Sequence, residues 1–333
     1  MTGNQSFIDG YNMEGLEKKA LQIIHSLPIE VYSYEPINWK RVQTTPIFIL
    51  YAKEGKYVLK LFPSPRGLIR KILNFLFGNL GLKNQVFIHE YLNKHEFSQF
   101  CVPILVSSDS LSYLLFKYID IEHKREYEID INRVVNGLIE FSFINSTKIN
   151  FKILRKFIGL SRKPLCVIIR RVFGSLRKKY GSTLAIDVFR MVVKCYLRQK
   201  PFLVRFLIHN DFHHNNIFFD RDGKLYISDF ENSIFESRWI LLDIVHYSVG
   251  TQKFSINTSA IKEFFSKFME KNADLEINFH AQLLLAFFLR ISQMILSPVP
   301  TEDVQKRYFN FLSNVLLDEH NFRKWLSKNF YGC

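Results

Sequence analysis

The chain has few cysteines and no long uninterrupted apolar segment, and both absences narrow its class. The four cysteines among 333 residues are Cys101, Cys166, Cys195 and Cys333. They lack the spacing of a zinc site or a disulfide framework, which suits a reducing cytoplasm. No window of eighteen apolar residues occurs, because Arg290 interrupts the best candidate after 283–289. A membrane-spanning helix is therefore not expected. A secretion signal is not expected either, because the first residues have no basic start followed by an apolar run.

Acidic residues are almost missing from one segment. The formal net charge is +14, and residues 151–200 hold fourteen lysines and arginines against one acid, Asp187. The remainder is therefore nearly neutral. Apolar residues recur among these charges at helical spacing, so this block is predicted to form amphipathic helices. Its positive face has three open interpretations: a solvated face with no special task, a surface for an anionic membrane or substrate, and a nucleic-acid contact.

A second segment favours the membrane interpretation. Residues 66–77 are basic and strongly apolar, which would be an unusual surface for a freely diffusing enzyme. The alternative is a helix packed on a sheet. Nucleic acid is the least favoured partner, and peripheral attachment to the inner face of a membrane stays open.

The most informative stretch is 209–216, which reads His-Asn-Asp-Phe-His-His-Asn-Asn. It is followed by two strand-like runs joined by a turn at 220–223, and then by Asp229. A hairpin brings its ends together, so Asn216 and Asp229 are predicted to be neighbours, with Asp211 within reach. Carboxylate and amide oxygens suit Mg²⁺ beside a nucleotide, and a further carboxylate can receive a hydroxyl proton. The pattern is typical of a kinase.

Simpler interpretations of this stretch are weaker. The histidines at 209 and 213 have the spacing of a helical zinc site, but no glutamate follows His209 in the general-base position. The loop is also not expected to be helical. Asp220 and Asp222 are most simply turn-forming residues.

This stretch resembles the catalytic loop of the aminoglycoside phosphotransferase and choline kinase-like family, whose members are relatives of the protein kinases. The family pattern is His-x-Asp-x-x-x-x-Asn, a strand pair, and then Asp-Phe/Trp-Glu. The matching positions here are His209, Asp211, Asn216, Asp229, Phe230 and Glu231. The resemblance implies an α+β, two-lobed protein-kinase-like fold with a small antiparallel-sheet N-lobe and a larger, mainly helical C-lobe. It also implies ATP and Mg²⁺ as cofactors.

The resemblance further assigns roles to individual residues. Asp211 becomes the catalytic base, and Asn216 and Asp229 become the Mg²⁺ ligands. Asp243, in the later run 239–244, resembles the family aspartate that braces the catalytic loop.

Lys60 is the main candidate for nucleotide binding upstream. It shares one face of a predicted strand with Val58 and Phe62, and a buried charge needs a partner. The resemblance implies that this lysine contacts the nucleotide phosphates and pairs with a glutamate on the next helix. Helical spacing in that region favours Glu90, with Glu96 as the fallback. The alternative is an exposed lysine and a solvated glutamate.

The turn that should hold the phosphates has no glycine. Predicted strands at 38–43 and 47–52 are joined by Thr44, Thr45 and a proline. Glycine allows backbone N–H groups to approach phosphates closely, so here the threonine hydroxyls are expected to do part of this work. By resemblance, the backbone from Phe116 to Tyr118 receives the adenine.

The predicted organisation has three parts. They are a lead-in with one helix at 13–26 (residues 1–35), an N-lobe (36–119) and a C-lobe (120–333) with closing helices at 279–296 and 304–317. The predicted function is transfer of the ATP γ-phosphate to a hydroxyl of a small molecule, saccharide or lipid headgroup. The alternative is a pseudokinase-type nucleotide-binding or membrane-associated interaction protein. A protein kinase is disfavoured, because only fourteen residues separate Asp229 from Asp243, too few for an activation segment.

Overall fold

The computed structural model describes residues 13–37, 46–62, 80–109, 112–122, 130–144, 164–297 and 300–331. The chain divides into two compact units. The sheet unit comprises Met1–Glu122 and Phe219–Glu231, and the helical unit comprises His123–Phe218 and Asn232–Cys333. A small antiparallel sheet in one unit and a mainly helical second unit confirm the predicted α+β class.

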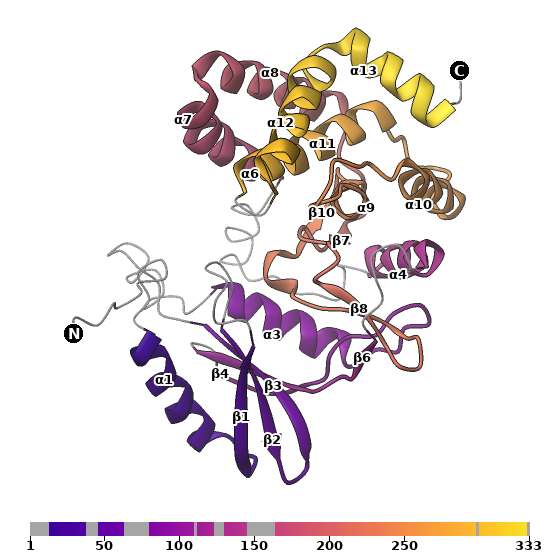
Figure 1. Cartoon of the computed structure of the whole chain (residues 1–333). Helices are drawn as coiled ribbons and strands as arrows, with labels where there is room; N and C mark the ends of the chain where they lie inside the picture. The colour runs from indigo at the N-terminus through magenta and orange to yellow at the C-terminus, as the bar shows by residue number, and fades with distance from the viewer. Residues whose placement is uncertain are drawn as a thin grey trace, which may run out of the picture. The chain divides into compact units, whose positions relative to one another are not determined.

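The sheet unit is built on five antiparallel strands in the order β1-β2-β3-β5-β4 (Figure 1). They are β1 (Val31–Ile37), β2 (Ile47–Ala52), β3 (Gly55–Leu61), β4 (Leu105–Asp109) and β5 (Tyr113–Lys117). The strand predicted at 38–43 lies outside the described residues. The first described strand is instead β1, which begins within the predicted lead-in.

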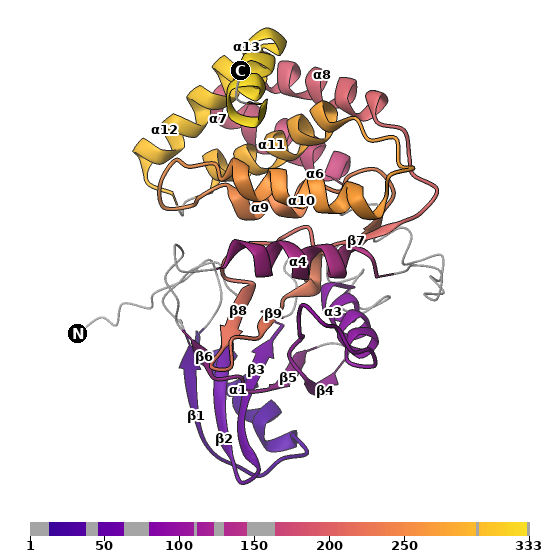
Figure 2. The same cartoon turned by 90° about the vertical axis from the view of Figure 1, so that its right-hand side faces the viewer.

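Two helices cover opposite faces of this sheet (Figure 1, Figure 2). Helix α1 (Met13–Ser26), as predicted, packs on one face, where it buries β3 residues Leu59 and Leu61. Helix α3 (Leu80–Leu92) packs on the other, where its Leu82 joins Phe62 and other buried residues. Side chains alternate along a strand, so Lys60 of β3 projects to the α3 face. Each fully buried leucine or phenylalanine stabilises the sheet by about 1.5–3 kcal/mol.

The predicted hairpin is present. Strands β8 (Ile217–Asp220) and β9 (Leu225–Ile227) form a three-stranded sheet with the short β6 (Ile121–Glu122). The Asp220 carboxylate accepts from the backbone N–H groups of Asp222 and Lys224 at 3.0 and 2.8 Å, which confirms its role as a turn former. The division of the sequence placed this hairpin in the C-lobe. The structure instead groups 219–231 with the sheet unit, because β8 pairs with β6 and Tyr226 bridges to Cys101.

The helical unit contains nine described helices. They are α4 (Ile131–Ser142), α6 (Pro164–Arg171), α7 (Arg177–Tyr180), α8 (Ser182–Arg198), α9 (Leu242–Ser248), α10 (Thr258–Lys271), α11 (Phe279–Leu296), α12 (Glu302–Phe311) and α13 (Glu319–Leu326). Single π-helical turns are η3 (Val172–Leu176), η5 (Leu312–Leu316) and η6 (Ser327–Tyr331). Strands β7 (Phe206–Ile208) and β10 (Ile234–Glu236) pair antiparallel, and a 3-10 turn, η4 (Phe230–Asn232), precedes β10.

Helix α11 forms the centre of the helical unit. The side chain of Asn278 caps its first turn by accepting from the N–H of Ala281. By length and composition the helix could cross a membrane. However, 72% of this 18-residue segment is buried within the structure, as in a core helix. Arg290, which interrupts the apolar run in the sequence, is itself buried in this core.

Candidate active site

Lys60, Gln85 and Asp229 form a compact polar cluster in the sheet unit. Lys60 is 8% exposed and Gln85 is 1% exposed. The Lys60 Nζ donates to Asp229 Oδ1 at 2.8 Å, and the Gln85 Nε2 donates to the same oxygen at 2.7 Å. Asp229 lies two residues after the end of β9, and its side chain is 35% exposed. The cluster therefore joins β3, α3 and the hairpin around one carboxylate oxygen.

The predicted ion pair between Lys60 and Glu90 is wrong. Gln85 and His89 lie on the buried face of α3, whereas Glu90 follows on the exposed face. A helix turns by about 100° per residue, so the residue after His89 points away from the sheet. The partner of Lys60 is Asp229. Glu96, the fallback, lies beyond the end of α3 and lines a pocket to which Lys60 does not contribute.

Two residues at the predicted site have left-handed backbone conformations. Asn210 has φ 62° and Asp229 has φ 64°, and no other non-glycine residue in the described part of the chain has positive φ. Such a conformation costs about 1–3 kcal/mol unless the surroundings enforce it, and asparagine and aspartate tolerate it best. Backbone strain of this kind gathers at functional sites. One of these residues is the metal-ligand candidate itself, and the other precedes Asp211.

The loop at 209–216 in the helical unit, which resembles a catalytic loop, is held by Asp243 of α9. Its carboxylate accepts from the backbone N–H groups of His209 and Asn210, both at 2.7 Å. This is the bracing contact that the resemblance implied. Burial raises the pKa of Asp243 to about 7, against the opposing effect of the two N–H donors.

Asp211 and Asn216 lie within this loop. The Asn216 side-chain nitrogen donates to the backbone carbonyl of Asp211 at 2.9 Å, which closes the loop on itself. The Asp211 Oδ1 lies 3.7 Å from the Nε2 atoms of His213 and His246, too far for a hydrogen bond.

A buried arginine contacts one of these two histidines, His246. The guanidinium of Arg290, which is 4% exposed, contacts His246 Nε2 at 2.5 Å. A guanidinium only donates, so His246 accepts at Nε2 and carries its proton on Nδ1. Sequence reasoning missed both residues. The available signals were a histidine three residues after Asp243 and a single charge within an apolar helix.

Solved structures with low sequence identity share this architecture. Choline kinase LicA from Streptococcus pneumoniae matches with a TM-score of 0.59 at 14% identity, over 91% of this chain and 99% of that chain. A streptomycin–ATP complex of APH(2'')-IIa matches with a TM-score of 0.55 at 15% identity, over 92% of this chain and 97% of that chain. Spectinomycin phosphotransferase APH(9)-Ia, crystallised with ADP and spectinomycin, matches with a TM-score of 0.50 at 12% identity. This match covers 95% of this chain and 93% of that chain. Neither a family model nor a curated protein matches the chain.

The chain has the kinase-like fold of the aminoglycoside phosphotransferases and choline kinases. The fold resemblance inferred from the 209–216 stretch is therefore confirmed, and the structural match covers about nine tenths of the chain.

The remaining nucleotide-binding predictions on this kinase-like fold stay predictions. Thr44 and Thr45 lie outside the described residues. Phe116 is buried on the α3 face of the sheet, where its ring centroid lies 4.8 Å from that of His89. The N–H groups of Lys117 and Tyr118 already donate to Ile104 and Lys56 carbonyls, both at 3.0 Å. An adenine at this segment would have to use other backbone groups or displace these bonds.

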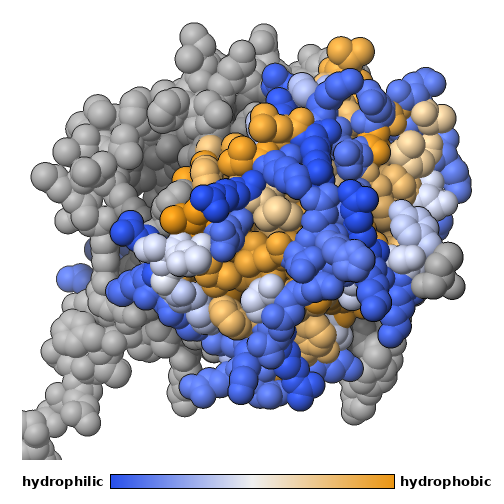
Figure 3. Space-filling view, turned by 90° about the horizontal axis from the view of Figure 1, so that it is seen from above, coloured by the Kyte–Doolittle hydropathy of each residue, from blue (hydrophilic) through white to orange (hydrophobic). Residues whose placement is uncertain are grey.

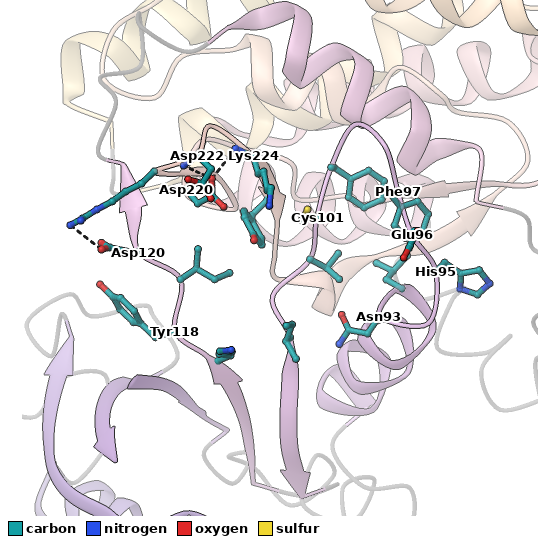
Figure 4. Close-up of a pocket in the computed structure, with 18 residues that line it drawn as sticks. Asn93, His95, Glu96, Phe97, Cys101, Tyr118, Asp120, Asp220, Asp222 and Lys224 are labelled. Atoms are coloured by element: carbon teal, nitrogen blue, oxygen red, sulfur yellow. Dashed lines mark hydrogen bonds and ion pairs between the residues drawn. The ribbon is translucent and has the colours of Figure 1, made fainter. Parts of the chain in front are cut away.

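A pocket of about 800 Å³ lies next to this segment in the sheet unit (Figure 4). It is bordered by residues 92–104, 117–120 and 220–226. Asp120 and Arg221 form an ion pair of 2.9 Å at its edge. Neither Lys60 nor Asp229 lines it, so it is distinct from the Lys60–Gln85–Asp229 cluster.

Two cations of the predicted basic block form ion pairs between helices α8 and α13. Lys194 and Arg198 of α8 both pair with Glu319 of α13, and Arg323 pairs with it as well. Hydrogen bonds from Lys194 and then Arg323 lower the pKa of Glu319 to about 2. Lys194 and Arg198, which belong to the basic block, therefore have an acidic partner within the helical unit.

Other parts of the helical unit expose apolar side chains. Figure 3 shows apolar and polar surface side by side on one face. Leu197 is 76% exposed, and Leu203 is fully exposed in the loop after α8. Residues 66–77 and 151–163 lie outside the described residues, so a membrane contact stays a prediction.

Proposed function

We propose that the chain is a phosphotransferase that uses Mg²⁺ and ATP to phosphorylate a hydroxyl group of a small molecule. The observation that carries this proposal is the Lys60–Gln85–Asp229 cluster within a kinase-like fold. A buried lysine bound to a partly exposed carboxylate is a pair that phosphates and a cation can separate. The loop braced by Asp243 would supply Asp211 as the base and Asn216 as the second metal ligand.

Asp211 would act as the catalytic base. Its carboxylate is 24% exposed, so it can meet an acceptor hydroxyl, orient it and take its proton. Asp243 fixes the backbone immediately before Asp211, and His246 Nε2 lies 3.7 Å from the Asp211 carboxylate. Lys60 would neutralise charge on the phosphates.

The chemistry of the two predicted ligands suits Mg²⁺. Asp229 provides a carboxylate, and Asn216 provides an amide whose nitrogen, rather than its oxygen, contacts Asp211. Mg²⁺ prefers a few oxygen ligands from protein together with phosphate oxygens. Bound there, it would neutralise charge on the transferred phosphoryl group. Asn216 and Asp229 are the residues that would hold it.

The structural neighbours support a nucleotide and a small acceptor. They include a choline kinase and antibiotic phosphotransferases crystallised with ATP or ADP. We infer a small-molecule, saccharide or lipid-headgroup acceptor for this chain. The positive charge of 151–200 and the exposed Leu197 and Leu203 support a cytoplasmic enzyme that works at the inner face of a membrane.

A pseudokinase-type interaction protein is the second candidate. The glycine-free turn at Thr44 and Thr45 favours it, because backbone N–H groups approach phosphates less easily there. Retained nucleotide binding with no transfer to any acceptor would support this alternative.

A thermal-shift screen followed by a transfer assay tests the proposal. Mg-ATP and Mg-ADP should raise the melting temperature of the full chain, because a ligand bound only to the native state stabilises it. Saccharides, amino alcohols and lipid headgroups would then be tested for ADP release. The absence of any shift with either nucleotide would contradict the proposal.

A further inference from the structure

The third member of the sheet-unit cluster is an uncharged amide, Gln85, to which the sequence analysis assigned no role. Gln85 lies on the buried face of α3, in line with Leu82 and His89. Its Nε2 donates to Asp229 Oδ1 at 2.7 Å. The resemblance implies that a glutamate of this helix accepts from Lys60, and the sequence assigned that role to Glu90, which is exposed. Gln85 instead donates to the carboxylate that Lys60 itself contacts.

This contact requires a donor at position 85. An ionised carboxylate only accepts hydrogen bonds, so a glutamate there could not donate to Asp229 and would repel it. Lys60 and Gln85 share the acceptor Oδ1 at 2.8 and 2.7 Å, and hydrogen bonds to charged groups are the stronger ones. The side chain of Asp229 is therefore held from two sides.

The helix that presents Gln85 is itself firmly packed. One turn after Gln85, the ring of His89 lies between Phe116 and Phe230, with centroid distances of 4.8 Å to each. Phe230 is fully buried and directly follows Asp229 in the chain. The Gln85 amide and the Asp229 backbone are thus anchored to the same aromatic cluster, which fixes their separation.

We propose that Gln85 is a positioning residue that holds Asp229 in its metal-binding orientation. This inference rests on the proposed function. Under the proposed function, Lys60 moves from Asp229 to the nucleotide phosphates, and it then no longer orients the carboxylate. Gln85, neutral and buried, keeps its hydrogen bond to Oδ1 when this happens. The amide therefore does for Asp229 what an outer-shell partner does for a metal ligand.

The test measures ADP binding by calorimetry, with and without Mg²⁺, for the full chain and three variants. Gln85→Met keeps the length of the side chain and removes the donor. Gln85→Glu keeps the shape and offers only an acceptor. Gln99→Leu is the matched control, since it replaces an exposed amide in the same unit.

The expected result is a selective loss. Both Gln85 variants should bind ADP without Mg²⁺ as the parent chain does, because Lys60 remains. The enhancement of ADP binding by Mg²⁺ should fall by about 10- to 100-fold, the usual effect of removing an outer-shell partner. Gln99→Leu should retain the full enhancement.

Each other outcome overturns a defined claim. If the parent chain shows no Mg²⁺-dependent ADP binding, the proposed function fails and the role of Gln85 fails with it. If the parent binds and Gln85→Met binds equally well, only the role of Gln85 is refuted. Full enhancement in Gln85→Glu would show that position 85 serves as an acceptor for Lys60. Equal loss with and without Mg²⁺, with a lower melting temperature, would indicate a purely structural residue.

Discussion

Asp229 in the sheet unit and Asp243 in the helical unit are held in contrasting ways. Each carboxylate accepts two hydrogen bonds of 2.7 or 2.8 Å. The donors to Asp243 are backbone N–H groups, and its side chain is buried. The donors to Asp229 are side chains, and it is partly exposed. A carboxylate bound by the backbone cannot be released without disturbing the loop, whereas one bound by the Lys60 side chain can exchange that contact for a cation.

The first prediction concerns Asp243→Ala, which should have the largest effect on stability. It leaves the N–H groups of His209 and Asn210 without their acceptor in a buried site. The free energy of unfolding should fall by about 4 kcal/mol, since each buried unsatisfied group costs about 1–3 kcal/mol. Urea unfolding measures the change, with Asp187→Asn, an exposed ion-pair residue, as control. A loss comparable to the control would remove the distinction between the two carboxylates.

The second prediction is a pH dependence. The pKa of Asp243 is about 7 in the folded state against an ordinary value of 3.8, so the folded state binds the proton more tightly. The part of the stability that comes from this tighter proton binding is full below about pH 4 and is lost as the pH rises to about 7. The stability of the parent chain relative to Asp243→Asn should fall by up to about 4 kcal/mol over this interval. A difference that stays flat or grows with pH contradicts the assignment.

The third prediction concerns Arg290→Met, which tests the buried contact between Arg290 and His246, whose Nε2 lies 3.7 Å from Asp211 Oδ1. The substitution removes the donor to His246 Nε2 within the core. A loss of about 2 kcal/mol is expected, because the imidazole nitrogen then lacks this partner. Stability should be measured by urea unfolding beside Gln293→Met, a neighbour on the same helix whose side chain accepts from Arg290. Unchanged or increased stability of Arg290→Met would show that a well-packed apolar side chain serves equally well there.

The smallest effect is expected for Glu90→Gln. Glu90 is exposed and has no ion pair among the described residues, so stability should change by less than about 0.5 kcal/mol. A marked loss of nucleotide binding in this variant would restore the pairing with Lys60 that helical spacing favoured.

The hairpin of β8 and β9 was predictable because its signals are local. Asp220 and Gly223 mark a tight turn, and the strands on both sides have clear apolar patterns. Asp211, Asn216 and Asp229 then follow in the order of a known loop. Asp243 was found in the same way, from a short run of residues that resembles a motif.

Gln85 and Arg290 were not predictable, because their roles depend on tertiary packing. An amide on a helix carries no charge signal, and only the register of α3 on the sheet shows that position 85, rather than 90, joins Lys60 at Asp229. Arg290 and His246 are 44 residues apart. Their contact arises from the packing of α9 against α11, which no spacing rule reveals.

The most direct test of the central claim compares ADP binding by Asp211→Asn and Asp229→Asn, with and without Mg²⁺. Asp229→Asn should lose the enhancement by Mg²⁺, because it lacks the carboxylate ligand, and should keep binding without the metal. Asp211→Asn should bind like the parent chain in both conditions, because its carboxylate serves the acceptor. Undiminished Mg²⁺-dependent binding by Asp229→Asn would contradict the account.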